Sequence, residues 1–200
     1  MLINPIRLPI ERLVPDEELF AQASDIHGQR HVARVVILGF VLVDRLNLPD
    51  DAPRLWAAIY LHDLGRTHDG RCYEHGRLAM ERLEQMPELR ELFAAGGVSD
   101  EDYEAIGVAV RSHCLPEELA PEHPHWRLTA LLKDADGLDR VRLGDLKPEY
   151  LRFDVSREMV RFAQALYDAT RRTVEPGPGY MGRLWPVAQE LAGLQGVLGV

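Results

Sequence analysis

Cysteine is scarce in this sequence of 200 residues, which contains only Cys72 and Cys114. Two cysteines are too few for a disulfide framework, and they do not form a closely spaced pair of the zinc-finger kind. We interpret both as free thiols in a reducing compartment. Each lies near a candidate metal ligand in the sequence, but neither is expected to be a ligand itself.

Long hydrophobic runs are also missing. No apolar stretch approaches the roughly 20 residues that cross a bilayer. Residues 1–13 lack the basic start and the continuous apolar stretch of a secretory signal. We therefore expect a cytoplasmic protein that has no membrane partner.

Positive charge is in short supply, because 32 acidic residues outnumber 23 Lys and Arg and give a formal net charge of −9. This balance argues against a nucleic-acid polymer or an anionic membrane as the main partner. It still permits a small phosphorylated ligand, since a metal ion and a few arginines can make a local positive pocket. The oligomeric state is left open, a homo-oligomer included.

Strand-like alternation is absent, whereas helical periodicity fills most of the chain. Three early prolines predict an extended start, with a first helix from near residue 16. Further helices are expected over residues 29–46, 53–64, 74–86, 99–113, 125–136, 156–173 and 184–194, with irregular chain over 66–73 and 143–155 and a turn at 175–179. The sequence thus predicts one all-α domain over 1–200, with a core at about 25–140 and a helical extension over 141–200.

Five side chains of metal-binding types lie on apolar faces of these expected helices, and a sixth, Asp63, directly follows one of them. Residues three, four and seven apart share a helix face, so His31 aligns with Leu38, and His62 aligns with Ile59. The complete set is His31, His62, Asp63, His75, His113 and Asp136. If the apolar faces meet in one core, the six polar groups meet there too.

A single histidine on an apolar face is more often a hydrogen-bonded core residue than a ligand. The two carboxylates change this balance, because an ionised Asp63 or Asp136 in a helical core needs a cation or several donors. Imidazole and carboxylate together suit Fe, Mn, Co, Ni or Zn. One or two such ions would satisfy all six side chains, and a two-ion site can hold the attacking and leaving oxygens of a phosphoryl transfer.

The pattern resembles the HD-domain phosphohydrolase superfamily, whose signature is a His, a His-Asp pair and a distant Asp, all on helices. The matching residues are His31, the pair within YLHDLGR at positions 60–66, and Asp136 within KDADGLD at positions 133–139. This resemblance implies a helical bundle of the HD-domain type, a bound metal and a phosphohydrolase reaction.

Two more histidines, His75 and His113, match a subset of that superfamily that binds two metal ions. The resemblance implies a first ion bound by His31, His62, Asp63 and Asp136, and a second bound by Asp63, His75 and His113. Branches with this ligand set include dinucleoside polyphosphate hydrolases and cyclic-dinucleotide phosphodiesterases of the HD-GYP type. The Gly-Tyr-Pro motif of the second branch is missing after the His-Asp pair.

Several cations near these residues are candidates for phosphate binding. Arg66 follows the His-Asp pair by three residues, and Lys133 precedes Asp136 by three, so both are expected at the mouth of the site. A helix C-terminal cation is an equal alternative for Arg66, and a solvated salt bridge is an equal alternative for Lys133. Arg34, on the face of His31, either contacts substrate or pairs with an acid.

Two further histidines and two acids have weaker assignments. His27 precedes the first ligand by four residues and is expected to support the ligands or bind substrate. His68 is a candidate proton donor to the leaving group, although an ordinary loop histidine is the more frequent outcome. Asp134 and Asp139 are expected to face away from Asp136 and to meet water or arginines.

The sequence therefore predicts a metal-dependent phosphohydrolase that cleaves a small phosphate ester or anhydride by metal-activated water. A nucleotide is the expected substrate, and Asp63, Arg66 and Lys133 are the expected catalytic residues. Two alternatives stay open. One is a di-iron oxygenase of the same fold with nearly the same ligands, and the other is a non-catalytic, metal-containing nucleotide sensor.

Overall fold

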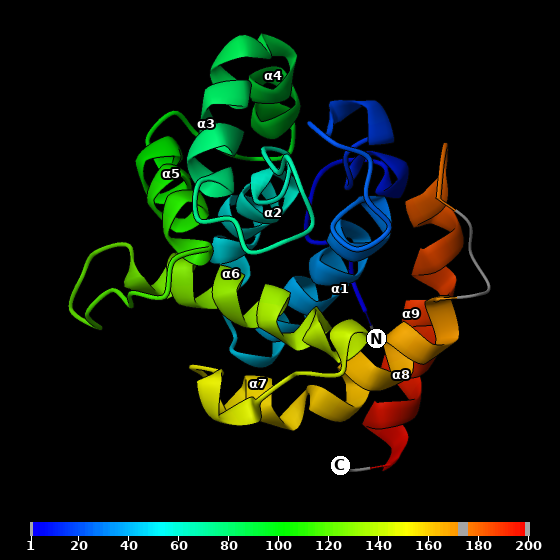
Figure 1. Ribbon diagram of the computed structural model, residues 1–200. Helices are drawn as coiled ribbons and strands as arrows, with labels where there is room; N and C mark the ends of the chain where they lie inside the picture. The colour runs from blue at the N-terminus through cyan, green and yellow to red at the C-terminus, as the bar shows by residue number, and fades with distance from the viewer. Residues whose placement is uncertain (1, 172–175, 199–200) are drawn as a thin grey trace.

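A computed structural model describes the backbone of residues 2–171 and 176–198, and side chains as far as residue 193. It confirms the all-α fold class, since helices and loops account for all of these residues and none is in a strand (Figure 1). The α-helices are α1 (Gln29–Arg45), α2 (Ala52–Leu61), α3 (His75–Gln85), α4 (Pro87–Ala95), α5 (Asp102–His113), α6 (Trp126–Leu138), α7 (Asp154–Glu158), α8 (Val160–Thr170) and α9 (Tyr180–Leu198). No helix in the described part is both long and apolar enough to cross a bilayer.

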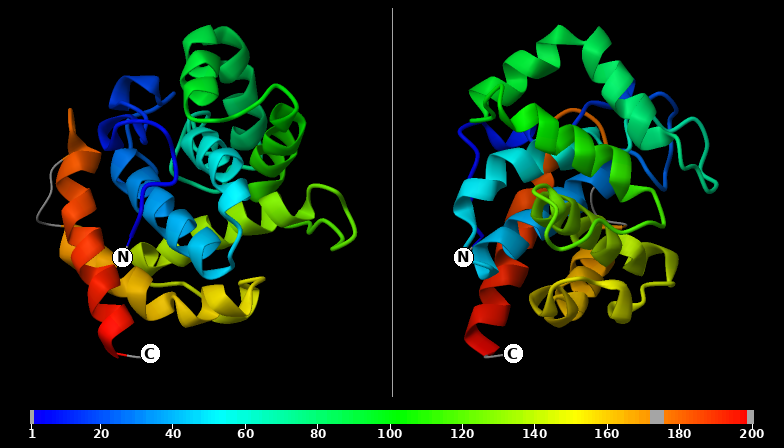
Figure 2. Two further views of the ribbon diagram at one scale, coloured as in Figure 1. Left: turned by 180° about the vertical axis from the view of Figure 1, so that it is seen from behind. Right: turned by 90° about the vertical axis from the view of Figure 1, so that its left-hand side faces the viewer.

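Helix α1 forms the centre of the core, because all but three of its 17 residues are buried. It packs against α2 and α6, while α8 and α9 lie side by side at its other flank (Figures 1 and 2). Gly39 permits the close approach of α2, since a Cβ there would lie 2.6 Å from the Cδ1 of Ile59. Each fully buried aliphatic side chain in this core contributes about 1.5–3 kcal/mol to folding.

Several expected helix boundaries are wrong. The helix expected over 156–173 is divided into α7 and α8, with its last two residues outside the described part, and the helix expected from residue 184 begins at Tyr180. The helix expected from residue 16 is only a 3-10 turn, Glu17–Leu19, because the chain then turns away and the amide of Ala21 donates to the carbonyl of Leu64. Helix α4 was not expected, since Pro87 was interpreted as the end of the helix before it. Proline is equally suited to the first turn of a new helix, which is its position here.

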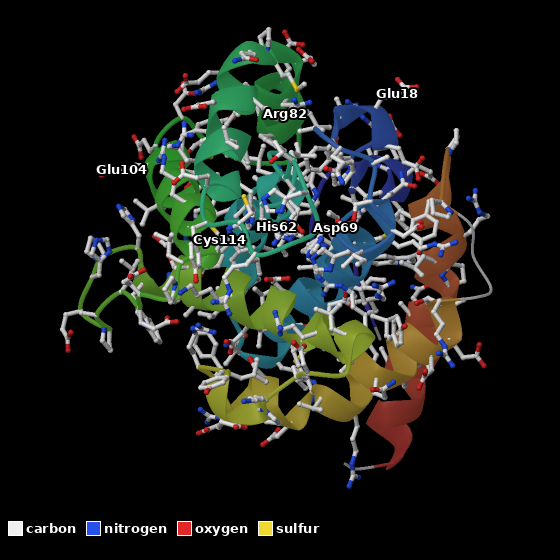
Figure 3. All side chains as sticks on the ribbon, in the orientation of Figure 1. Glu18, His62, Asp69, Arg82, Glu104 and Cys114 are labelled. Atoms are coloured by element: carbon white, nitrogen blue, oxygen red, sulfur yellow. The ribbon has the colours of Figure 1, made fainter. Side chains whose placement is uncertain are left out.

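The fold brings five helix ends to one place. His31 lies in the first turn of α1, His62 follows the last residue of α2, and His75 begins α3. His113 ends α5, and Asp136 lies in the last turn of α6. Figure 3 shows His62 near the middle of the molecule, beneath the loop that joins α2 to α3.

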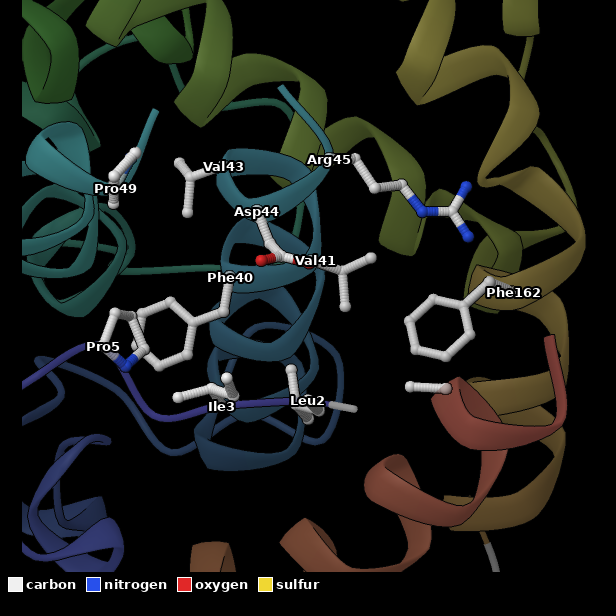
Figure 4. A pocket seen from close by; sticks show the side chains of 11 residues that line it. Leu2, Ile3, Pro5, Phe40, Val41, Val43, Asp44, Arg45, Pro49 and Phe162 are labelled. Atoms are coloured by element: carbon white, nitrogen blue, oxygen red, sulfur yellow. The ribbon is translucent and has the colours of Figure 1, made fainter. Parts of the chain in front are cut away.

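An apolar cavity of about 390 Å³ lies elsewhere, between the N-terminal segment, the C-terminal half of α1 and Phe162 of α8 (Figure 4). Its wall includes Leu2, Phe40 and Val43, and among the described residues that line it, Asp44 and Arg45 carry charge. Among the described residues, none that lines this cavity also lines the cavity at the converging helix ends.

Candidate metal centre

The six side chains predicted from the helical faces converge. Nε2 of His31 lies 3.1 Å from Nε2 of His62, and Nε2 of His75 lies 2.8 Å from Nε2 of His113. Asp136 approaches the first pair, with its Oδ1 at 3.2 Å from Nε2 of His31. The structure thus brings together nitrogen and oxygen atoms from five separate helical segments.

Asp63 lies between the two histidine pairs. Its Oδ2 is 3.4 Å from Nε2 of both His31 and His62, and its Oδ1 is 3.3 Å from Nε2 of His75. Burial opposes ionisation of this carboxyl, but His62, His31 and Arg66 outweigh burial and hold its pKa well below the usual range. An ionised carboxylate with its two oxygens directed to different pairs is suited to bridge two cations.

The four rings share one orientation, in which Nδ1 is bound to an oxygen and Nε2 faces the cluster. The Nδ1 partners are Asp139 Oδ2 for His31 (2.7 Å), Ile59 O for His62 (2.7 Å), Cys72 O for His75 (2.6 Å) and Val110 O for His113 (2.6 Å). Ionised carboxylates and carbonyls only accept hydrogen bonds, so Nδ1 carries the proton. Metal-binding histidines in proteins are held in this way.

This arrangement fits a metal ion. Burial lowers the pKa of His75 to about 4 and that of His113 to about 3. Both rings are therefore neutral at pH 7, and their Nε2 lone pairs face each other at 2.8 Å. Two buried lone pairs at this distance repel each other unless a cation lies between them. Nitrogen and carboxylate donors together suit divalent transition metals.

The cluster opens into a cavity of about 410 Å³. Asp63, His75, His113 and Asp136 form its floor, and four arginines contribute to its wall: Arg66, Arg71, Arg140 and Arg142. Tyr73 lies at the rim with 46% of its surface exposed. Four guanidinium groups beside a metal-type cluster, in a chain of net charge −9, mark this cavity as a place for an anion.

Arg66 and His27 both line this cavity, as their expected roles require. Nε of Arg66 donates to Oδ1 of Asp63 at 2.8 Å, and its Nη1 donates to the carbonyl of Gly70 at 3.1 Å. Nδ1 of His27 lies 3.1 Å from Oδ1 of Asp69. Their roles toward substrate remain predictions.

Three other residues predicted at the site do not line the cavity: Lys133, His68 and Arg34. The Lys133 amine is buried and donates to the carbonyls of Leu115 and Glu117 and to the Glu118 carboxylate. It therefore fastens the turn after α5 and does not reach the cavity, contrary to expectation. His68 is exposed on its loop and does not line the cavity.

Arg34 pairs with an acid, which is the second of the two alternatives expected for it. It is buried and binds Asp139 through two hydrogen bonds, Nε to Oδ1 at 2.6 Å and Nη2 to Oδ2 at 2.9 Å. It does not line the cavity. Asp139 meets arginines, as expected, but it also binds a ring of the cluster.

Sequence reasoning missed the wall residues Arg71 and Arg142, and it did not expect Cys114 among the groups that could hold a metal. The ligating atoms of Cys114, His75 and His113 lie within 4.8 Å of one another. The Cys114 thiol donates to the carbonyl of Tyr73 at 3.2 Å. A signal existed for Cys114, which directly follows a predicted ligand, but nothing local indicated that Arg71 would turn toward the cluster.

The metal-free protein is expected to lose stability as the pH falls from about 6.5 to about 4. The lowered pKa values of His75 and His113 mean that the unfolded chain binds protons in this range that the folded chain does not. The two histidines together give a slope of up to about 2.7 kcal/mol per pH unit.

His31 has the opposite effect on how the stability of the folded protein changes with pH. Burial and Arg142 disfavour its charged form, but the hydrogen bonds to Asp136 and Asp139 outweigh them and raise its pKa. Its contribution is complete below pH 6.5 and is lost only as the pH rises above that value, so it does not cancel the acid effect. Urea unfolding of chelator-treated protein at pH 6.5 and pH 5 measures the difference, and equal midpoints would contradict the expectation.

Comparison with known families decides the identity of the helical core. The HD domain pattern matches residues 28–141, which is more than half of the chain. The protein belongs to the HD domain family. The matched range begins just before α1 and ends after α6, so it contains all six converging side chains.

Membership in the HD domain family places the protein among metal-dependent hydrolases, generally phosphohydrolases. HD domains bind divalent metals, and two groups of side chains in the described part of the chain could hold one: His31, His62 and Asp136, and His75, His113 and Cys114. Comparisons with curated proteins and with solved structures gave no match.

Proposed function

We propose that this HD domain is a phosphohydrolase that cleaves a phosphate ester or anhydride of a small molecule, with a nucleotide as the expected class of substrate. The observation that carries the proposal is the set of four histidines whose Nδ1 atoms are bound by oxygen acceptors and whose Nε2 atoms face the cluster, three of them toward Asp63. This arrangement is typical of histidines that bind a metal through Nε2, whereas histidines in an ordinary core do not need it.

The proposal includes two metal positions, which these contacts support. The first uses His31, His62, Asp63 and Asp136, and the second uses Asp63, His75 and His113. Fe, Mn, Co, Ni and Zn all suit this donor set. A divalent ion held there supplies Lewis acidity and lowers the pKa of water toward neutrality.

The protein's own residues bind and orient the substrate. Arg71 is exposed at the cavity, and no hydrogen bond or ion pair ties it elsewhere among the described contacts. Arg140 and Arg142 line the same wall, and their planar guanidinium groups suit paired phosphate oxygens. Arg66 holds Asp63 between the two histidine pairs, where its carboxylate would bind metal, and His27 contacts substrate while Asp69 holds its Nδ1.

The cavity volume supports a small substrate. About 410 Å³ falls in the lower part of the range of small-molecule sites, roughly 300–1,000 Å³. A polymer would need an open groove and a basic surface, whereas this chain has a net charge of −9. We therefore propose that the binding partner is a small phosphorylated molecule.

Phosphate release by the reconstituted protein tests the proposal. The protein is stripped with a chelator, reloaded with Mn²⁺ or Co²⁺, and assayed on nucleoside mono-, di- and triphosphates and dinucleoside polyphosphates. We expect hydrolysis that requires the metal, with a KM raised by about 10-fold in Arg71→Gln, the size of one lost charged hydrogen bond.

Other outcomes of that assay would overturn it in favour of a different function. Oxygen consumption by iron-loaded protein without phosphate release would identify a di-iron oxygenase. Tight nucleotide binding with no turnover under any metal would identify a sensor.

A further inference from the structure

The four histidines of the cluster are not supported alike. His62, His75 and His113 each donate their Nδ1 proton to a backbone carbonyl, whereas His31 donates it to the carboxylate of Asp139 at 2.7 Å. A carboxylate acceptor carries a full negative charge, so its hydrogen bond to imidazole is stronger than that of a carbonyl. The His31 side of the cluster therefore has an electrostatic support that the other side lacks.

Asp139 is itself rigidly held. Only 1% of its surface is exposed, and Arg34 donates to both of its oxygens, at 2.6 and 2.9 Å. Arg142 lies 3.4 Å from its Oδ2. Burial raises the pKa of Asp139, but Arg34 and His31 outweigh burial and lower it, so the carboxylate is ionised.

The position of Asp139 in the sequence explains its contact. It follows Asp136 by three residues, at the point where α6 passes into a 3-10 turn, Asp139–Leu143. Asp136 approaches Nε2 of His31 at 3.2 Å, and Asp139 approaches Nδ1 of the same ring at 2.7 Å. Two acids one helical turn apart thus hold a single imidazole from both of its nitrogens.

We propose that Asp139 is a positioning residue for the metal position formed by His31, His62, Asp63 and Asp136, and that it has no equivalent at the His75–His113 position. This inference rests on the proposed function. Asp139 fixes the proton on Nδ1 of His31, which leaves Nε2 as a lone-pair donor, and its charge makes that donor more basic. Loss of this charge weakens one metal position and spares the other.

Asp134 provides a matched control within the same short segment. Its side chain is fully buried, and it accepts hydrogen bonds from the backbone amides of Arg152 and Phe153 and from the Arg152 side chain. None of its contacts among the described residues is with a histidine. Asp134→Asn therefore removes a buried, arginine-paired charge just as Asp139→Asn does, but without touching the cluster.

Calorimetric titration of the chelator-stripped proteins with Zn²⁺ tests the inference without any activity assay. Wild type and Asp134→Asn are both expected to bind Zn²⁺ at both positions, and at each position the affinity of the variant should equal that of the wild type. In Asp139→Asn, one position is expected to weaken by about 10–100-fold while the other keeps its wild-type affinity. Equal weakening of both positions, or no weakening, would overturn the inference and leave the proposed function standing, whereas wild type that binds no metal would remove the proposed function itself.

A second measurement needs no substitution, in case Asp139→Asn does not fold. In the nitrogen-15 spectrum of histidine-labelled, Zn²⁺-loaded wild type, His31 should carry its proton on Nδ1. Among the Nδ1 protons of His31, His62, His75 and His113, that of His31 should resonate furthest downfield, because only its hydrogen bond is to a carboxylate. A proton on Nε2 of His31, or an ordinary shift on Nδ1, would contradict the assignment.

Discussion

Replacement of Asp63 by alanine is expected to abolish metal binding at both positions and to reduce phosphate release by at least about 10³-fold. The loss should exceed the roughly 10–100-fold that follows removal of a group that only supports a ligand. Asp63 is the side chain whose oxygens face three of the four Nε2 atoms, at 3.3 to 3.4 Å. Without it, the two histidine pairs share no ligand and have less negative charge to hold cations.

Metal content by elemental analysis and kcat on the best substrate measure this effect. Asp134→Asn is the control, because it also removes a buried carboxylate but leaves the cluster intact. Circular dichroism shows whether the Asp63→Ala protein retains its helices, since Arg66 also loses its partner. Full metal content and full turnover in Asp63→Ala would refute the assigned role.

Gly76→Ala is the second substitution for which a large effect is expected. A Cβ at Gly76 would lie 2.1 Å from the carbonyl oxygen of Val110, so α3 and α5 cannot keep their separation. That same carbonyl accepts the Nδ1 proton of His113, and His75 is the residue before the glycine. We expect a loss of about 3 kcal/mol in the free energy of unfolding, together with weaker metal binding at the His75–His113 position.

Gly107→Ala is the matched control on the facing helix. A Cβ there would approach the Nη1 of Arg111 at 2.7 Å, and this flexible side-chain end can move aside. Alanine also favours a helix interior over glycine by up to about 1 kcal/mol, so Gly107→Ala should be neutral or stabilising. Urea unfolding of the metal-free proteins measures both, and a wild-type midpoint for Gly76→Ala would contradict the packing argument.

Helical periodicity placed five of the six candidate ligands on apolar helix faces, and Asp63 was chosen for its place beside His62. His31 and His113 were identified because each shares a face with aliphatic residues, and the structure shows that these faces meet. Periodicity determines which side of a helix a residue occupies, and burial of apolar faces determines which sides meet. For residues on regular helices, these two rules suffice to predict convergence.

The same rules failed for residues whose positions depend on long side chains or loops. Lys133 lies one turn from Asp136, but its flexible side chain reaches the carbonyls of the turn after α5. Arg71 is on the loop between α2 and α3, where no period applies. Asp139 was expected to face away from Asp136, but it lies one helical turn after it and contacts the other nitrogen of the same His31 ring. Helical periodicity does not predict the orientation of that ring, on which this contact depends.

The account depends on metal ions held between the histidine pairs, and the metal content of freshly purified protein tests this most directly. We predict about two divalent transition-metal ions per chain, lost on treatment with a strong chelator and recovered on addition of the metal. Protein that contains no metal after purification and binds none when Mn²⁺, Fe²⁺, Co²⁺ or Zn²⁺ is added would contradict the account.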